Sequence, residues 1–217
     1  MITCPVCAQS STEDCGDLRG CRACGHVFQH PPIVTARYDA KYVGRYDSYP
    51  TEGISLLRLG LLEGYVRGGR LLDVGYGNGA FVRVGEAAGF DAFGYDVHGH
   101  DFGVAEVDIH TDSSQWDVVT FFDSLEHFSD LDEVRGLLSR TRFVMISVPQ
   151  RPVDFPANRA WRHYRPGEHL HYFSQASLQR FFRRPLLAAS NLEDVIRRPE
   201  LGRPNILTCL FGAPPSA

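Results

Sequence analysis

From about residue 51 onward, short apolar runs alternate with segments in which apolar residues recur every three or four positions. Runs of the first kind are typical of buried strands, and segments of the second kind are typical of helices that cover a sheet. Strands are predicted at residues 70–75, 91–96, 116–122 and 142–148, and helices at residues 51–66, 80–89 and 131–140. This alternation predicts an α/β fold with a doubly wound, mostly parallel sheet.

The region after the fourth predicted strand is irregular until about Phe173. A helix is then predicted at residues 175–184, where Ser174 has a side chain suited to the N-cap position. Two late strands are predicted near residues 193–198 and 205–211. They would complete the sheet after its parallel part.

Two individual segments add detail to this fold. The helix predicted at residues 51–66 has one apolar face, formed by Ile54, Leu57, Leu61 and Tyr65. The gap between Asp96 and Val104 is too short to hold a full crossover helix. We therefore expect an abbreviated sheet at that edge.

The first 30 residues have few aliphatic side chains and five of the six cysteines. Four of these cysteines form two Cys-x-x-Cys pairs separated by 13 residues: Cys4, Cys7, Cys21 and Cys24. Paired thiolates at this spacing are typical of a tetrahedral zinc site, and four sulfur ligands leave no open position for catalysis. The sequence therefore predicts a zinc-ribbon-like head over residues 1–30 with a structural Zn²⁺. The alternative, a pair of redox dithiols, lacks a redox-enzyme strand pattern around it.

A tyrosine-rich linker follows at residues 31–50 and carries Tyr38, Tyr42, Tyr46 and Tyr49. The spacing favours a short helix packed on the main domain, and the alternative is a lid over a cofactor pocket. The chain is thus expected to have three parts, namely the head at residues 1–30, the linker or lid at residues 31–50 and the α/β domain at residues 51–217.

The segment "LLDVGYGNGAF" connects a predicted strand to a predicted helix. It contains an acidic residue and three glycines spaced two apart: Asp73, Gly75, Gly77 and Gly79. Glycines allow a tight turn and a close approach of the backbone to a ligand, but a dinucleotide fingerprint spaces them differently. The carboxylate of Asp73 would repel a phosphate and suits an ammonium group. Asp96 ends the next strand, where such folds hold a ribose diol. A nucleoside with an amino-acid tail, S-adenosyl-L-methionine, satisfies both features.

This constellation resembles the class I S-adenosylmethionine-dependent methyltransferases, whose first motif is an acidic residue followed by G-x-G-x-G. The segment "QWDVVTFFDSLEHF" at residues 115–128 is similar to the fourth-strand segment of that superfamily. The segment "EHLHYFS", followed by an amphipathic helix and two strands, is similar to the end of its small-molecule branch. The likeness covers about residues 51–211 and implies a Rossmann-like fold.

The resemblance also implies a cofactor site. Asp73 and the three glycines would surround the methionine moiety of the cofactor, and Asp96 would hold its ribose. Asp108, in "AEVDIH", would lie near the adenine, and Phe122 and Asp123 would flank the cofactor. A cysteine-rich head also precedes the class I domain in sugar C-methyltransferases and in a guanine methyltransferase that acts on ribosomal RNA.

Four further residues are candidates for the acceptor side: Glu126, His127, His169 and His171. In an extended segment, His169 and His171 point to one side and Glu168 points to the other. We therefore expect both histidines in one pocket, with His169 as the general base, since histidine titrates near neutral pH. His171, His127 and Glu126 would contact the acceptor. The alternatives are that these side chains only cap a helix or order a loop, or that they bind a second metal ion.

Composition and charge narrow the range of possible acceptors. The net charge of −4 and the pI of about 6.1 give no global attraction to nucleic acid, although Arg180, Arg183 and Arg184 form a local basic patch. No apolar run approaches the roughly 20 residues that span a bilayer, and no secretory signal precedes the clustered cysteines, so we expect a cytoplasmic protein. The loop at residues 150–166 carries four arginines: Arg151, Arg159, Arg162 and Arg165. They would suit an anionic acceptor, or they form a solvated basic loop.

We therefore expect an enzyme that methylates a small molecule, such as a sugar or a phosphate-bearing acceptor. The first alternative is an RNA base methyltransferase that binds RNA through the zinc head. The second is a non-catalytic, cofactor-binding scaffold.

Overall fold

Six strands form the main sheet of the protein. The computed structural model describes residues 2–36, 51–97, 102–197 and 205–213. The strand order is β5 (Phe90–Tyr95), β4 (Gly69–Val74), β6 (Trp116–Phe122), β7 (Thr141–Pro149), β10 (Ile206–Phe211) and β9 (Leu186–Ser190). The first four strands are parallel, and β10 is antiparallel to both of its neighbours. The predicted mostly parallel sheet is confirmed.

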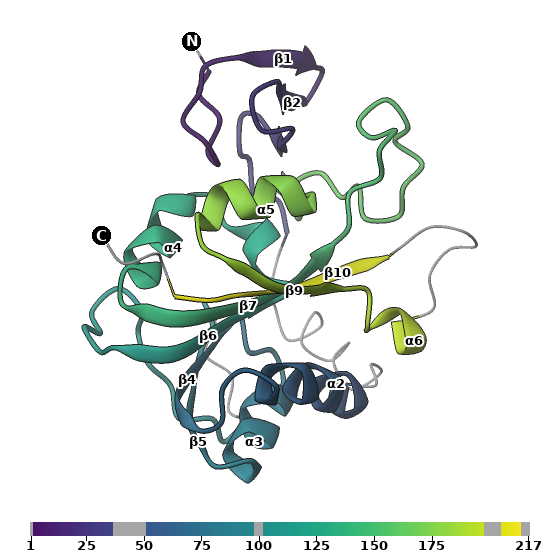
Figure 1. The fold of residues 1–217 in the computed structure, drawn as a ribbon. Coiled ribbons are helices and arrows are strands. Elements are labelled where there is room, and N and C mark those ends of the chain that lie inside the picture. The colour runs from purple at the N-terminus through teal and green to yellow at the C-terminus, as the bar shows by residue number, and fades with distance from the viewer. Residues whose placement is uncertain (1, 37–50, 98–101, 198–204, 214–217) are drawn as a thin grey trace.

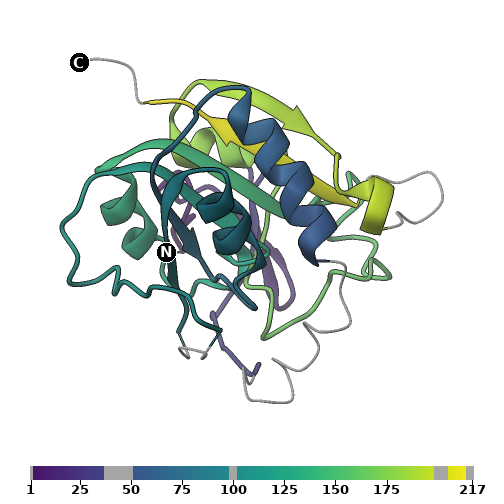
Figure 2. The ribbon, with the colours of Figure 1, turned by 90° about the horizontal axis from the view of Figure 1, so that it is seen from below.

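Helices cover both faces of this sheet. The helices α2 (Thr51–Glu63) and α3 (Ala80–Ala87) lie on one face, and α4 (Leu131–Leu138) and α5 (Gln175–Phe182) lie on the other (Figure 1). Figure 2 shows α2 and α3 across the first face. Each face has its own buried cluster, since an amphipathic helix stabilises the fold by burying its apolar stripe on the sheet. The doubly wound, Rossmann-like fold class is therefore confirmed.

The prediction of a strand near residues 193–198 is wrong. The sheet is completed instead by β9 at residues 186–190, and α6 (Asp194–Arg197) is a short helix. The carboxylate of Asp194 accepts hydrogen bonds from the backbone N–H groups of Asn205 and Ile206, at 2.9 and 3.1 Å. These bonds join α6 to the start of β10, and β9 lacks the β-branched and aromatic residues that identify strands.

The buried face of α2 also differs from the predicted one. Ile54 is buried as expected, but Tyr65 is 44% exposed and lies beyond the end of the helix. The buried residues of α2 are Ile54, Ser55, Arg58, Leu59 and Leu62. Arg58 is buried on this face and hydrogen-bonds to Glu193, a distant partner that periodicity cannot reveal.

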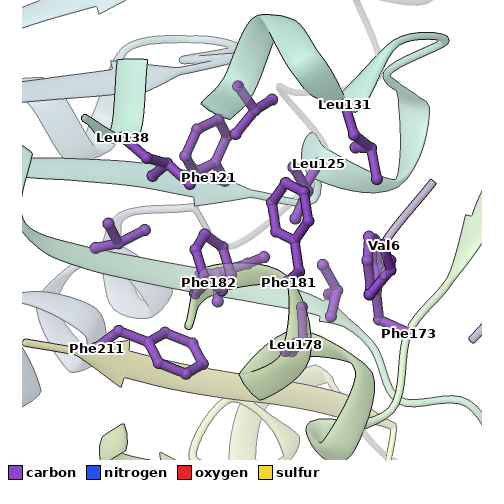
Figure 3. Close-up of a cluster of buried hydrophobic side chains, with 14 of the residues drawn as sticks. Val6, Phe121, Leu125, Leu131, Leu138, Phe173, Leu178, Phe181, Phe182 and Phe211 are labelled. Carbon is purple, nitrogen blue, oxygen red and sulfur yellow. The ribbon is translucent and has the colours of Figure 1, made fainter. Parts of the chain in front are cut away.

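The cluster between the sheet and the helices α4 and α5 reaches beyond the main domain. It contains Phe121, Leu131 and Phe181, and also Val6 of the cysteine-rich head (Figure 3). Val6 is 1% exposed, so the head is packed on the domain rather than attached only by its linker. In Figure 1 the head lies beyond α5, on the same side of the sheet as α4.

The head itself is a small antiparallel sheet. Its strands β1 (Thr12–Cys15), β2 (Leu18–Cys21) and β3 (Val27–Gln29) are joined by β8 (His171–Tyr172), so the order is β1-β2-β3-β8. A third, smaller cluster forms around this sheet: Leu18, Val27, Phe155, Trp161 and Tyr172. The head therefore shares both a sheet and a core with the loop that precedes α5.

Three expectations concern the remaining segments. The four tyrosines of the linker lie outside the described residues. Within the described ranges, the segment after Asp96 contributes only an isolated parallel bridge between Gly94 and Glu106, as expected for an abbreviated edge. None of the helices in the described ranges combines the length and the apolar character that crossing a membrane requires.

Candidate functional site

The four cysteines of the head converge at one point. The Sγ atoms of Cys4 and Cys24 are 3.7 Å apart, and those of Cys7 and Cys21 are 3.6 Å apart. A tetrahedral zinc with Zn–S bonds of about 2.3 Å requires S–S edges of about 3.8 Å, so the side chains fit the ion. The hydrogen bond between the two thiols lowers the pKa of Cys4 and raises the pKa of Cys24, so Cys4 is the thiolate of this pair.

A cavity of about 520 Å³ lies at the carboxyl ends of β4 and β6. Its walls are the turn after β4, one face of α2, the residues that follow β6 and part of the loop before β8. Ligands of open parallel sheets bind at this edge, and the volume lies within the usual range for small-molecule sites. The cavity is therefore the candidate active site.

The glycine turn forms the floor of this cavity. Gly75, Gly77 and Gly79 have φ values of +79°, +58° and +74°, which side chains other than that of glycine rarely adopt. A Cβ atom on Gly75 would lie 2.6 Å from the Cβ of Ser124. The turn therefore requires glycine for both its conformation and its packing. Gly75 and Gly77 line the cavity, and Gly79 is the N-cap residue of α3.

Asp73 lies beneath this turn and is almost completely buried. Its exposed fraction is 2%, and its Oδ1 accepts a hydrogen bond from the hydroxyl of Thr120 at 2.7 Å. Burial raises the pKa of Asp73 to about 6, although the Thr120 hydroxyl and the charge of Arg58 oppose the shift. The site therefore holds a carboxylate that lacks a full counter-charge.

A buried ionic network lies next to Asp73. Arg58 of α2 donates to both carboxylate oxygens of Glu193, at 2.7 and 2.9 Å, and to Asp123 at 3.4 Å. Arg197 of α6 also pairs with Asp123. Burial would raise the pKa of Asp123, but the charges of Arg197 and Arg58 outweigh it and lower the pKa to about 2. Only Asp123 of these four residues was predicted from the sequence.

The other end of the cavity contains Glu126, His127 and His169. Glu126 is 1% exposed, and neither of its carboxylate oxygens has a hydrogen-bond partner among the residues that the structure describes. The rings of His127 and His169 meet edge to face, with centroids 4.9 Å apart. One ligand atom from each of the three residues lies within 4.8 Å of the other two, so the cluster could bind either an acceptor or a divalent cation.

The protonation states of this cluster follow from burial. Burial raises the pKa of Glu126 well above its usual value, and the charge of Asp123 adds to the effect. Burial also lowers the pKa of His127, and it lowers the pKa of His169 to about 3, so the expectation that His169 titrates near neutral pH is wrong. His169 Nδ1 lies 2.9 Å from the carbonyl oxygen of His163. A carbonyl can only accept, so Nδ1 carries the proton and Nε2 keeps a free lone pair.

His171 lies elsewhere, and the expectation that it shares a pocket with His169 is wrong. Its Nδ1 lies 3.1 Å from His26 Nε2, and its Nε2 lies 3.0 Å from the carbonyl oxygen of Phe128. The alternation of side chains fails because only residues 171–172 form a strand, whereas Glu168 and His169 belong to a turn and both line the cavity.

Asp96 and Asp108, which were expected to contact the nucleoside part of the cofactor, are not among the residues that line the cavity. Asp96 directly follows β5 and is half-buried. Asp108 is exposed and accepts hydrogen bonds from the backbone N–H of His110 and the hydroxyl of Thr111, which closes a local turn. This arrangement does not support a contact between Asp108 and the adenine of a cofactor. Phe122 and Asp123, in contrast, do line the cavity, as the resemblance implied.

The arginines of the loop at residues 150–166 divide into two pairs. Arg151 donates to the carbonyl oxygen of Gly25, and Arg159 pairs with Asp17, so both contact the head. Arg162 and Arg165 line the cavity and are exposed, and Arg165 is paired with Glu168 at 3.0 Å. The loop therefore both contacts the head and places positive charge at the cavity entrance.

The comparisons with known proteins agree with this architecture. Residues 48–185 match a family model described as a methyltransferase domain. No curated protein matches the sequence significantly.

Similar folds occur among solved structures. One is the magnesium protoporphyrin IX methyltransferase of Synechocystis PCC 6803 with bound S-adenosylhomocysteine, at 13% identity and a TM-score of 0.53, covering 82% of this chain and 89% of that one. The N-methyltransferase NodS of Bradyrhizobium japonicum WM9, in complex with S-adenosylhomocysteine, has 13% identity and a TM-score of 0.56, with 78% and 91% covered. A methyltransferase of Archaeoglobus fulgidus that depends on S-adenosylmethionine has 14% identity and a TM-score of 0.54, with 80% and 100% covered. At these identities the likeness concerns the fold.

Proposed function

The chain belongs to the methyltransferase domain family, and on that premise we propose that it transfers a methyl group from S-adenosylmethionine to a small-molecule acceptor. One observation carries the proposal. A single cavity has the glycine turn with Asp73 at one end and the imidazoles of His127 and His169 at the other. Such a cavity can hold a methyl donor and an acceptor side by side, and a methyl transfer requires this proximity.

The cofactor would occupy the end formed by the glycine turn. Two of the similar folds contain bound S-adenosylhomocysteine, which supports this choice of ligand. The buried carboxylate of Asp73 suits the ammonium group of the methionine moiety, since a cation would supply the missing counter-charge. Phe122 and Asp123 would flank the cofactor, and Asp96, at the end of β5, would accept hydrogen bonds from the ribose.

The acceptor would occupy the end formed by the histidines. A sulfonium is already an activated leaving group, so the protein mainly has to align the acceptor with the methyl carbon and exclude water. His169 Nε2 has a lone pair that can accept a hydrogen bond from the acceptor; because burial lowers the pKa of this ring to about 3, it would act as a base only for an acceptor whose bound negative charge raises that pKa. Glu126 and His127 would contact the acceptor beside it. His171 has no part in this proposal because it hydrogen-bonds to His26 and Phe128.

The exposed arginines favour an acceptor with a negative charge. Arg162 and Arg165 lie where a phosphate or carboxylate could be held while the rest of the molecule enters the cavity. The net charge of −4 disfavours a polynucleotide, which binds through many cationic contacts. We therefore propose a phosphate-bearing or otherwise anionic small molecule, such as a modified sugar.

The proposal is tested by binding and then by transfer. Titration calorimetry with S-adenosylhomocysteine comes first, and no binding at 1 mM ligand would exclude a cofactor site. Transfer from methyl-labelled S-adenosylmethionine is then measured against a pool of anionic metabolites and, separately, against total RNA. Label incorporated only into RNA, with strong salt dependence, would favour the RNA methyltransferase. Turnover that survives exhaustive chelation, with the zinc head still folded, would exclude a divalent cation at Glu126, His127 and His169.

A further inference from the structure

The zinc-binding head contributes a strand to the loop that carries Glu168 and His169. Val27 of β3 is paired with Tyr172 of β8, and Phe28 is paired with His171. The residues paired in this way are about 140 positions apart in the sequence, and the pairing begins two residues after His169. The head therefore abuts the acceptor end of the cavity.

Gln29, the last residue of β3, holds both ends of the short segment that contains Glu168 and His169. Its backbone N–H donates to the carbonyl oxygen of Leu170 at 2.8 Å. Its side-chain Oε1 accepts a hydrogen bond from the N–H of Gly167 at 2.7 Å. Gln29 is 8% exposed, so these bonds are shielded from water.

The side chain of Gln29 is itself fixed by the chain that follows the head. Its Nε2 donates to the carbonyl oxygen of Ile33 at 3.0 Å. The backbone N–H of Thr35 donates in turn to the carbonyl oxygen of Gly167 at 2.9 Å. Gly167 has a φ of +78°, and a Cβ atom there would lie 2.0 Å from the hydroxyl oxygen of Thr35. The two segments thus approach each other as closely as glycine allows.

The opposite side of the same segment is held by the methyltransferase domain. The N–H of Leu170 donates to the carbonyl oxygen of Glu126 at 2.8 Å, and His169 Nδ1 donates to the carbonyl oxygen of His163 at 2.9 Å. His169 is therefore located between contacts from the domain on one side and contacts from the head on the other. Only the head contacts depend on the four cysteines that fit a zinc ion.

We propose that the zinc-binding head is the scaffold of the acceptor half of the active site, with Gln29 as the positioning residue for Glu168 and His169. The assignment of this end of the cavity to the acceptor rests on the proposed function. The positioning of Glu168 and His169 by Gln29 does not. The head acts through backbone and side-chain hydrogen bonds and leaves the glycine turn untouched. Loss of zinc or of the Gln29 side chain should therefore disturb the histidine end of the cavity and spare the cofactor end.

The experiment compares Gln29→Ala with the zinc-stripped full chain. Hydrogen exchange of the Gly167 amide should accelerate at least tenfold in both, because its buried acceptor on Gln29 is lost or displaced, and the amides of residues 168–170 should accelerate with it as the segment loosens. Amides of β4 should keep their protection, and the affinity for S-adenosylhomocysteine should stay within twofold. In nitrogen NMR spectra, the fraction of His169 with its proton on Nδ1 should fall, because the ring is no longer held against His163. A purely structural head would not move this signal.

Two further variants complete the design. Gln29→Glu keeps an oxygen opposite the N–H of Gly167, but only its protonated form can also donate to the carbonyl oxygen of Ile33, so it should restore most of the protection at residues 167–170 at acid pH and not when ionised. Arg19→Ala is the matched control, since the side chain of Arg19 contacts Gly16, Leu18 and Asp14 within the head. Exchange at residues 167–170 that stays unchanged in Gln29→Ala, or that rises equally in Arg19→Ala, would overturn the proposal.

Kinetics add a separate readout once an acceptor has been found. In Gln29→Ala, kcat/KM for the acceptor should fall at least tenfold while KM for S-adenosylmethionine stays unchanged. If the protein neither binds S-adenosylhomocysteine nor transfers methyl groups, the proposed function fails, but the exchange and NMR results still decide the role of Gln29. The two failures are thus distinguishable.

Discussion

Replacing Asp73 by asparagine tests the stability of the empty cavity and its affinity for a cofactor at the same time. Asp73 is 2% exposed, and burial raises its pKa from 3.8 to about 6. The folded state therefore binds the proton more tightly than the unfolded state does. Stability is highest below the unfolded pKa and falls as the pH rises from about 4 to about 6.

The magnitude follows from the shift. One pKa unit corresponds to about 1.36 kcal/mol, so the ionised carboxylate costs the folded protein about 3 kcal/mol above pH 6. An asparagine removes this cost, but its amide hydrogens need acceptors, and a buried donor without one costs about 1–3 kcal/mol. The change in stability at one pH thus combines two opposing effects. The change in the free energy of unfolding between pH 4.5 and pH 7.5 isolates the titration. Over this range the wild type should lose about 2 kcal/mol of stability that Asp73→Asn does not lose.

The assay is urea unfolding of both proteins at pH 4.5 and pH 7.5, with S-adenosylhomocysteine affinity measured by calorimetry at pH 7.5. Loss of the carboxylate should weaken the binding of S-adenosylhomocysteine by at least about 2 kcal/mol, or about 30-fold, because the ammonium group of the ligand would be left without a partner. Asp91→Asn is the control, since Asp91 is exposed on β5 and should change neither quantity. An equal pH response in Asp73→Asn and the wild type would refute the assigned titration. Unchanged affinity would refute the proposed ammonium contact.

Three shorter predictions concern the rest of the site. His169→Ala should lower kcat by about 10²–10⁴-fold with S-adenosylhomocysteine affinity kept within twofold, and full turnover would remove its role as a base. Glu193→Ala should lower the free energy of unfolding in urea by about 3–5 kcal/mol, because Arg58 loses its buried partner, whereas Glu52→Ala on the exposed side of α2 should change it little. Mass-spectrometric metal analysis should find one zinc per chain and much less in Cys7→Ser, and less than half an equivalent in the wild type would contradict the zinc site.

The elements that were predicted well are those determined by neighbouring residues. The strand at 116–122 has the bounds expected from its apolar run, and the helix at 131–140 differs only at its last turn. The capping of α5 by Ser174 is also observed. Turn chemistry, capping and burial periodicity act over a few residues, so they can be read directly from the chain.

The errors occur where a distant partner decides the structure. Arg58 is buried because Glu193, 135 residues later, neutralises it. His171 turns away from the cavity because His26 and the carbonyl of Phe128 offer it hydrogen bonds. Neither pairing leaves a pattern in the sequence, since an arginine or a histidine looks the same whether its partner is water or a buried side chain.

The sequence by itself determined the parallel sheet, the glycine turn and the two cysteine pairs, because each depends on local backbone preferences or on ligands close together in the chain. Only the tertiary structure decided that the head pairs with β8, that His169 and not His171 enters the cavity, and that Arg58 and Glu193 form its buried ionic wall. These features depend on hydrogen bonds and ion pairs between residues that are more than a hundred positions apart. Their energy is gained only when the whole chain has folded, so the histidine end of the cavity is a product of assembly rather than of any one segment.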